Sequence, residues 1–392
     1  MNSTVSGSAP TVGGSLLSVD GDGRVLVGGR PPTAGDGVAR ALARLVVHGI
    51  RDDAVERAIS VDQTNTSVIV DDRVVVKIVG RWAAADRAGD LLERLAAAGS
   101  DDIAALHGRV EWRHPELGTS TLALVTEYLP GAEDGWTWAV DDVVAVLDGR
   151  GPDPAWPALL GRRVARIHDV LGAGAVPTGA DAAELRVARA SASLDRALAA
   201  ASGRVRARLH NRRATLARAI RSLAGSAPGL EFPIHGDLHL GQVLASPGDD
   251  ADGRRYTIID FDGDPQLEAS DRERADAAAR DVAHLLVSFD LVAAVAQKRV
   301  RRADPAAFAW ADRARAAFLD AYRDALRHPE LFDDTLLPGF EAEQLVAELH
   351  YADRFLPGWR YAPDAAITHR HPSTHELPEE PWTPPPSAPT ST

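Results

Sequence analysis

Residues 235–264, HGDLHLGQVLASPGDDADGRRYTIIDFDGD, carry the pattern that decides the fold class of this chain. The stretch begins with His235, Gly236 and Asp237 and ends, after the apolar run YTII, with Asp260 and further aspartates. Between the polar clusters the pattern indicates a strand, a polar turn and a strand, a hairpin that would bring both ends to one edge. Two carboxylates at one edge suit phosphoryl transfer, because one can accept a hydroxyl proton while the other binds Mg2+. The competing interpretation is an ordinary turn aspartate and a strand-end cap.

The segments HGDLHLGQ and DFDGD resemble the aminoglycoside-phosphotransferase-like kinases, and among them the actinobacterial maltokinases and glucosamine kinases. The segments DQTNTSV (62–68), PGAEDGW (130–136) and RDVA (280–283) resemble the same branch, so the resemblance covers about residues 60 to 360. It implies an α+β, bilobal protein-kinase-like fold with an N-terminal α/β cap subdomain, a β-rich N-lobe and a mainly helical C-lobe. The family pattern has asparagine where this chain has Gln242, a departure that the maltokinase-like branch shares.

The resemblance implies roles for the residues of the opening stretch. Asp237 would be the catalytic base that accepts the proton of the acceptor hydroxyl. Asp260 and Asp262 would bind Mg2+ beside ATP, and Gln242 would add its amide oxygen, since Mg2+ prefers oxygen ligands.

Three further residues are expected to support the catalytic loop or the core. The resemblance implies that Asp281 accepts backbone N–H groups of the catalytic loop, with a simple helix charge as the alternative, and that His235 is structural. His168 lies on an apolar helical face in ARIHDVL, a pattern typical of a hydrogen-bonded core histidine rather than a ligand.

Lys77 interrupts the apolar run VVVKIV, in a chain whose other lysine is Lys298 and whose remaining basic residues are arginines. The resemblance implies that Lys77 pairs with the α- and β-phosphates of ATP. Burial of an unpaired ammonium is costly, so we expect a carboxylate partner. Glu93 in GDLLERL is our prediction, with Asp86 and Asp90 as competitors; a lysine facing solvent at a strand edge is the alternative.

Two further segments are expected to bind ATP. Residues 63–67, QTNTS, stand where protein kinases carry a Gly-rich phosphate loop, and hydroxyls and backbone N–H groups can hold phosphate without glycine. An ordinary polar hairpin turn is the alternative. Residues 126–129, TEYL, end a predicted strand before Pro-Gly and would form the hinge whose backbone binds adenine. The predicted ATP contacts are Asn65, Thr66, Ser67, Glu127 and Leu129.

An amino-sugar site needs polar groups matched to hydroxyls, an aromatic platform and carboxylates for the amine. The segments ELHYADR (348–354) and PGWRY (357–361) offer these at helical turn spacing. We predict substrate contacts from Glu348, Tyr351 and Trp359, and from His239 and Asp264 near the base. A packed helix followed by an exposed turn is the alternative.

The acceptor is predicted to be glucosamine, giving glucosamine 6-phosphate and ADP, because this terminal stretch departs from what is expected of a maltokinase. Maltose, phosphorylated on its anomeric hydroxyl, is the first alternative. An aminoglycoside phosphotransferase and a pseudokinase that binds nucleotide without turnover are the others. Gln242 weighs against an aminoglycoside phosphotransferase, and it is the one feature that suggests a pseudokinase.

The composition excludes several classes of function. A net charge of −13 disfavours a nucleic-acid partner, and the absence of cysteine excludes disulfides and thiolate sites. The chain has no apolar run near the roughly 20 residues of a membrane-spanning helix, and MNSTVSGSAP lacks the order of a signal peptide. We therefore expect a cytoplasmic protein without a membrane partner, monomeric rather than oligomeric.

The chain is predicted to divide into four parts. Residues 1–60 form the cap subdomain, 61–129 the nucleotide-binding N-lobe and 130–370 the helical C-lobe with the catalytic and substrate sites. Residues 371–392 are Pro- and Ser-rich, a composition typical of a disordered tail.

Overall fold

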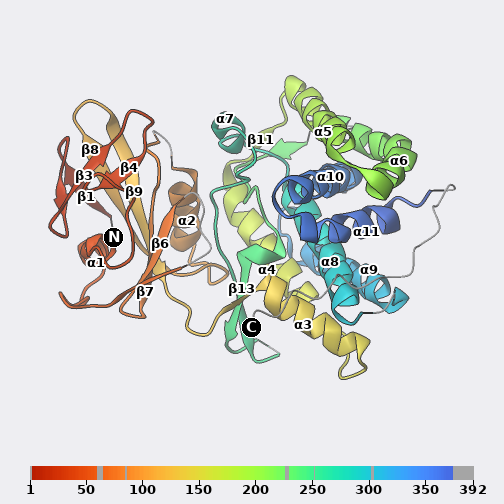
Figure 1. Ribbon diagram of the computed structural model, residues 1–392, viewed down its shortest axis with the longest axis horizontal. Coiled ribbons are helices and arrows are strands. Elements are labelled where there is room, and N and C mark those ends of the chain that lie inside the picture. The colour runs from red at the N-terminus through yellow and green to blue at the C-terminus, as the bar shows by residue number, and fades with distance from the viewer. Residues whose placement is uncertain are drawn as a thin grey trace, which may run out of the picture.

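The computed structural model describes residues 2–59, 65–83, 86–225, 229–250, 252–301 and 304–373, which form two lobes (Figure 1). A mixed sheet and two helices make up the N-lobe, and the C-lobe is mainly helical, so the predicted α+β bilobal fold is confirmed. The predicted tail lies outside the described residues except for 371–373. In the part of the chain that is described, no helix combines the length and apolar character needed to cross a membrane.

The N-lobe is built on a six-stranded sheet with the order β1-β8-β9-β7-β6-β5. Strands β1 and β8 run parallel, and the other neighbours are antiparallel. The strands are β1 (Ser3–Ser6), β5 (Glu56–Ala58), β6 (Thr66–Val70), β7 (Val74–Ile78), β8 (Leu106–His114) and β9 (Gly118–Glu127).

The hairpin β6–β7 places Lys77 at the centre of this sheet. Its strands are rich in valine and isoleucine, which suit a half-buried pleated surface. Asp71 and Asp72 have φ values of 58° and 48°, and the Arg73 N–H donates to the Val70 carbonyl (3.1 Å). Two left-handed residues inside a four-residue turn form the type I′ geometry that matches the twist of paired strands.

The predicted boundary between a cap subdomain and the N-lobe at residue 60 falls inside one sheet and one core. Strands β1 and β5 form the two edges of the main sheet, and Leu17, Leu42, Val76 and Trp112 belong to a single buried cluster. The cap therefore has no separate core. The first residues add a small sheet and one helix: β2 (Thr11–Val12), β3 (Ser15–Val19), β4 (Val25–Val27) and α1 (Val38–Val46).

Helix α2 (Arg87–Ala97) lies between the sheet and the C-lobe (Figure 1). The Asp86 carboxylate caps it by accepting the Gly89 N–H (3.0 Å), which satisfies one free donor of the first turn. Ala88, Leu91 and Leu95 are buried in the cluster that forms the C-lobe core. The helix therefore belongs to the N-lobe in sequence and to the C-lobe in packing.

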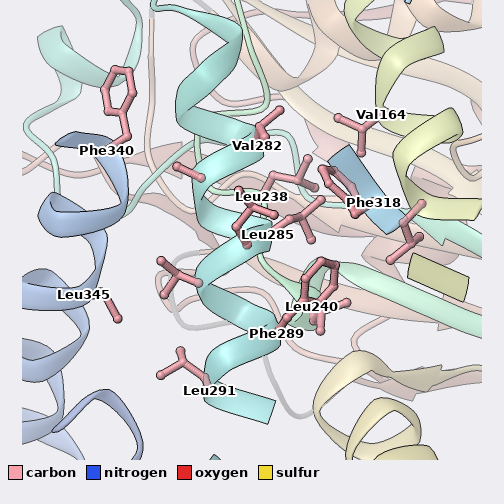
Figure 2. Close-up of a cluster of buried hydrophobic side chains, with 14 of the residues drawn as sticks. Val164, Leu238, Leu240, Val282, Leu285, Phe289, Leu291, Phe318, Phe340 and Leu345 are labelled. Carbon is pink, nitrogen blue, oxygen red and sulfur yellow. The ribbon is translucent and has the colours of Figure 1, made fainter. Parts of the chain in front are cut away.

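The C-lobe is arranged around α8 (Ala278–Arg299), which is buried along almost its whole length. Figure 2 shows Leu238 and Leu240 of the catalytic loop lying against Leu285 and Phe289 of this helix. The other helices are α3 (Gly135–Leu147), α4 (Trp156–Leu171), α5 (Ala180–Ala200), α6 (Gly203–Arg221), α7 (Ala269–Arg272), α9 (Pro305–Ala325), α10 (Leu337–Phe355) and α11 (Tyr361–Arg370).

The predicted hairpin between the two aspartate motifs is confirmed. Strands β13 (Val243–Pro247) and β14 (Arg254–Ile258) pair antiparallel, and β10 (Glu133–Asp134) extends them to a three-stranded sheet. A second small sheet joins β11 (Val176–Pro177) and β12 (Leu230–Glu231). Short 3-10 turns occupy Gly172–Gly174, Ser222–Ala224, Leu240–Gln242, Pro329–Leu331, Asp334–Leu336 and Pro357–Trp359.

Helices α4 and α9 approach closely at Gly161, where an added Cβ would lie 2.3 Å from the Phe318 carbonyl oxygen. We expect Gly161→Ala to lower the free energy of unfolding by about 1–3 kcal/mol through overpacking, although alanine is the better helix former. Gly174→Ala is the control, because its Cβ would meet no atom within 4 Å. Equal urea midpoints for the two variants would contradict the close approach.

Candidate active site

The catalytic loop is held by the buried carboxylate of Asp281 on α8. Its two oxygens accept the backbone N–H groups of His235 (2.7 Å) and Gly236 (2.8 Å), the residues before Asp237. His168, also fully buried, lies 3.2 Å from the same carboxylate and 2.8 Å from the Tyr322 hydroxyl. The predictions that Asp281 braces the loop and that His168 is a core histidine are therefore confirmed.

These contacts keep Asp281 ionised in the core. Burial by itself raises the pKa of Asp281, but the hydrogen bond and charge of His168, with the His235 and Gly236 contacts, lower it to about 2. About two helical turns beyond, the Ser288 hydroxyl accepts the Leu240 N–H (3.2 Å). Helix α8 thus binds the loop on both sides of Asp237.

His235 joins the catalytic loop to the end of β14. Its Nε2 lies 2.9 Å from the Ile259 carbonyl and its Nδ1 accepts the Asp237 N–H at 3.3 Å, so Nε2 is the protonated nitrogen. Burial lowers the pKa of His235, which favours this neutral form. The residue thereby connects the base to the segment that carries Asp260.

Asp237 lies in a pocket of negative charge. Its side chain is 17% exposed. Burial raises the pKa of Asp237 well above its usual range, and the charges of Asp264 and Asp260 raise it further, while Arg280 opposes them. The three carboxylates are therefore close enough to interact, so the structure brings together the two aspartates on which the sequence argument depends.

Lys77 reaches from the N-lobe sheet to two of these carboxylates. Its Nζ lies 2.6 Å from an oxygen of Asp260 and 2.6 Å from an oxygen of Asp262. Burial would lower the pKa of Lys77, but the two aspartates raise it above its usual value. The pairing also lowers the pKa of Asp260 against the effect of its burial. Asp260 itself follows β14 with a φ of 65°, a left-handed backbone that turns its side chain out of the strand direction.

The predicted pairing of Lys77 with a carboxylate of α2 is wrong for this structure. Glu93 accepts from the Arg109 Nη2 (3.2 Å) and from the Asn2 side chain (2.9 Å), and Asp90 also pairs with Arg109 (2.8 Å). Arg109 lies on β8, which β9 separates from the strand of Lys77, and helix α2 packs against β8. The prediction failed because helical spacing does not tell which strand a helix faces.

The residues predicted to bind metal are compatible with Mg2+. Asp260 and Asp262 share one cationic partner, and the Gln242 amide nitrogen donates to Asp260 (3.2 Å), which leaves a carbonyl oxygen as the atom suited to a metal. Among the described residues, no group of three His, Cys, Asp or Glu could hold a metal. Two carboxylates and an amide still fit Mg2+, because this ion is usually held by one or two carboxylates together with substrate phosphates.

The predicted phosphate loop falls partly on described residues, from Asn65 onward; Gln63 and Thr64 lie outside them. The Asn65 amide donates to Asp262 (2.8 Å), and Ser67 lies opposite Lys77 in the hairpin register. Thr66 instead contacts the Pro32 carbonyl (3.2 Å). Asn65 therefore lies beside Asp262 and Ser67 lies beside Lys77, whereas the Thr66 hydroxyl bonds to the Pro32 carbonyl away from them.

The hinge has the backbone pattern expected of an adenine site. The N–H groups of Glu127 and Tyr128 donate to the carbonyls of Ala105 (2.8 Å) and Arg73 (3.0 Å). That of Leu129 has no protein acceptor within the described ranges. The Glu127 side chain pairs with Arg255 (3.4 Å) rather than facing the cleft. Leu129 is thus the amide available for a purine, and Glu127 would contribute through its carbonyl.

An aromatic wall lies beside Asp237. His239, two residues after the base, stacks on Trp136 with ring centroids 6.0 Å apart, and Trp359 meets Trp136 edge-on at 5.4 Å. The His239 Nδ1 accepts the Gly241 N–H (3.0 Å), and burial lowers the pKa of this histidine. The proton is therefore on Nε2, 3.9 Å from the Asp237 carboxylate.

Glu348 faces the same region from α10. Burial raises the pKa of Glu348 to about 7, while His239 lowers it and the charges of Asp237 and Asp264 raise it further. Tyr351 is one turn later on this helix and packs on Phe355 (5.0 Å), so its proximity to the site rests on helical spacing. Asp264 lies 3.8 Å from Arg280.

The sequence argument did not identify Trp136 as a site residue. It ends the segment PGAEDGW and is the second residue of α3, where Asp134 caps the helix by accepting its N–H (2.9 Å). The sequence signal that could have identified Trp136 is an aromatic residue placed just after a helix cap, close behind the hinge segment.

The comparisons with known proteins agree with this geometry. The chain is 38% identical over 380 residues to a glucosamine kinase of Streptacidiphilus jiangxiensis, covering 89% of this chain and 83% of the relative. It is 37% identical to a glucosamine kinase of Mycolicibacterium smegmatis, covering 80% and 78%. It also resembles a solved glucosamine kinase in complex with glucosamine, ADP and inorganic phosphate, with a TM-score of 0.77, 35% identity and coverage of 93% and 88%. No family model matches the chain.

Asp281→Asn is expected to lower kcat at least tenfold and the free energy of unfolding by roughly 2 kcal/mol, because one charged acceptor of two loop amides is lost. The matched control is Asp290→Asn, on the same helix and equally buried, which pairs with Arg315 (3.2 Å) away from the loop. The control should lose stability and keep kcat, as measured by urea unfolding and a coupled ADP assay. An equal loss of kcat in both variants would contradict the role of Asp281.

Proposed function

The chain belongs to the glucosamine kinase family, and we propose that it transfers the γ-phosphoryl group of ATP to the 6-hydroxyl of glucosamine. The observation that carries this proposal is that Asp237 lies close enough to Asp260 and Asp264 for their charges to raise its pKa, that Lys77 pairs with Asp260, and that Glu348 faces the same region. Phosphoryl transfer needs positioned phosphates, a compensated charge and an aimed hydroxyl, and each need is matched by residues of this site.

Asp237 would accept the proton of the acceptor hydroxyl as the hydroxyl oxygen attacks the γ-phosphorus and the bond to the ADP oxygen breaks. Its raised pKa brings this carboxylate closer to the operating pH, as suits a general base. The Nε2–H of His239, 3.9 Å from Asp237, is a donor that can orient the acceptor. His235 holds the base at its backbone N–H.

Lys77, Asp260, Asp262 and Gln242 would hold the triphosphate end of the nucleotide. Lys77 offers its ammonium to phosphate oxygens, and the two aspartates with the Gln242 oxygen are the residues that would bind Mg2+. When bound, Mg2+ neutralises phosphate charge. Asn65 and Ser67 lie near enough to add donors, and the Leu129 N–H and Glu127 carbonyl would hold adenine.

The charge and the shape of the acceptor site both favour glucosamine. An ammonium group is attracted by carboxylates, and Glu348 and Asp264 bring two of them to the side of the site that faces His239. Trp359 and Trp136 supply the apolar surface on which a sugar ring can lie. A neutral disaccharide would offer Glu348 only hydroxyl donors, without the positive charge that compensates a buried carboxylate. Because ATP is supplied inside cells, we place the reaction in the cytoplasm.

The function is tested by coupled ADP release with ATP, Mg2+ and glucosamine, maltose, glucose or kanamycin as acceptor. We expect turnover with glucosamine and phosphate on its primary hydroxyl. Turnover with maltose in place of glucosamine would reject the acceptor, and nucleotide binding without turnover on any sugar would reject the kinase.

Asp237→Asn should lower kcat by about 100- to 10,000-fold and leave ATP affinity nearly unchanged, because it removes the base without altering the nucleotide contacts. Asp195→Asn, an exposed position on α5, is the control with wild-type kinetics. Full activity of Asp237→Asn would remove this residue from the mechanism.

The pH dependence of acceptor binding tests Glu348. Because its pKa is raised to about 7, Glu348 takes up a proton as the pH falls through that value and stops attracting an ammonium. The KM for glucosamine should rise from about pH 7.5 to 5.5 in the wild type. Glu348→Gln should have a higher KM and a flatter profile. An unchanged slope in the variant would show that Glu348 does not bind the amine.

A further inference from the structure

Arg87 is the first residue of α2, and its buried side chain crosses to the catalytic loops of the C-lobe. Its Nη2 donates to the carbonyl oxygen of Ile234, the residue before the His235-Gly236-Asp237 motif. The residue is 8% exposed although it carries a charge. It therefore joins an N-lobe helix to the loop of the base by a direct bond.

The guanidinium also lies against two glycines that flank the reacting groups. A Cβ added to Gly236 would be 3.2 Å from the Arg87 Nη2, and one added to Gly263 would be 3.4 Å from its Nε. The two glycines approach each other as well, since the Gly236 Cβ would be 3.3 Å from the Gly263 Cα. Gly236 precedes Asp237 in the chain and Gly263 follows Asp262, so Arg87 contacts both loops within one residue of a functional side chain.

Burial of the charged Arg87 guanidinium costs free energy, which nearby groups have to offset. Burial lowers the pKa of Arg87, and the negative charges of Asp281, Glu273 and Asp262 oppose that effect. Its Nε has no hydrogen-bond partner in the described part of the chain. A guanidinium does not lose its proton in proteins, so the charge stays buried with few direct bonds. Attraction to these carboxylates, which lie on α8, just after α7 and in the segment of Asp260 and Asp262, is what compensates the buried charge.

We propose that Arg87 is a positioning residue that holds the catalytic loop and the metal-binding loop at the spacing required for phosphoryl transfer. Glu93, the residue of α2 that the sequence predicted as the partner of Lys77, is instead bound to Arg109, and Lys77 is bound to the aspartates. Arg87 touches no reacting atom and acts through the backbone of Ile234, Gly236 and Gly263. This inference rests on the proposed kinase function.

The same helix offers a matched control. Arg94, two turns later, donates from Nη2 to the carbonyls of Leu171 (2.6 Å) and Val170 (3.4 Å) at the end of α4. It is also an arginine bond between α2 and the C-lobe, but it lies away from the two loops. Arg94→Ala therefore removes comparable packing without altering the spacing of the loops.

The test compares Arg87→Ala, Arg87→Lys and Arg94→Ala. We expect Arg87→Ala to lower kcat by about 100-fold with the KM for glucosamine changed less than about threefold, because a misplacement of about 1 Å costs such a factor. Arg87→Lys should recover part of kcat, and Arg94→Ala should keep it with a similar loss of melting temperature. Added guanidinium should restore activity to Arg87→Ala, since a cavity of about 260 Å3 borders Arg87, Gly236 and Gly263.

A kcat loss shared equally by Arg87→Ala and Arg94→Ala, or a change confined to KM, would overturn the proposal. If the wild-type protein transfers no phosphate, that result rejects the proposed function but does not test the positioning role of Arg87. Amide exchange then tests the positioning role separately: residues 234–240 and 259–264 should exchange faster in Arg87→Ala than in Arg94→Ala, and equal rates would overturn it.

Discussion

The ionised Asp281 side chain, buried inside the C-lobe, is the interaction on which the rest of the site depends. A carboxylate without partners would be protonated there, so its charge is retained because His168 and two loop amides surround it. The same bonds define the path of the catalytic loop, since the amides of His235 and Gly236 have one acceptor and Asp237 follows them. Helix α8 can hold a loop in this way because it is buried on all sides and cannot shift without disturbing α3, α9 and α10.

Around this anchor the site concentrates negative charge and balances it from the other lobe. The charges of Asp260 and Asp264 raise the pKa of Asp237, and the Lys77 ammonium reaches Asp260 and Asp262 from the N-lobe sheet. Mutual repulsion among carboxylates favours bound cations, which suits a metal, a lysine and an amino sugar alike. The protein's own charges are thus already arranged to attract the cations that the reaction uses.

The lobes are joined through α2 rather than through the sheet alone. Leu91 and Leu95 are buried in the C-lobe core, and Arg94 and Arg87 bond to carbonyls of α4 and of the catalytic loop. Because α2 packs into the C-lobe core, it helps to fix the position of the N-lobe sheet, and with it Lys77, relative to Asp237. Near Asp237, the rings of Trp136, His239 and Trp359 are in contact, and we propose that this wall helps to select the acceptor.

The sequence by itself determined the elements and their order. Two short apolar runs around a polar turn predicted β13 and β14 with an aspartate motif at each end, because strand and turn preferences act over a few residues. Roles for His235, Asp237, Asp260 and Asp281 could be proposed as well, because the motifs that carry the family resemblance are contiguous in the chain. Only the tertiary structure decided that Lys77 meets Asp260 across 183 positions, that Glu93 binds Arg109, that the cap shares the N-lobe core, and that Arg87 reaches Ile234 across 147 positions. Such contacts depend on how helices and sheets pack, and local periodicity shows which face of an element is apolar but not which neighbour it meets.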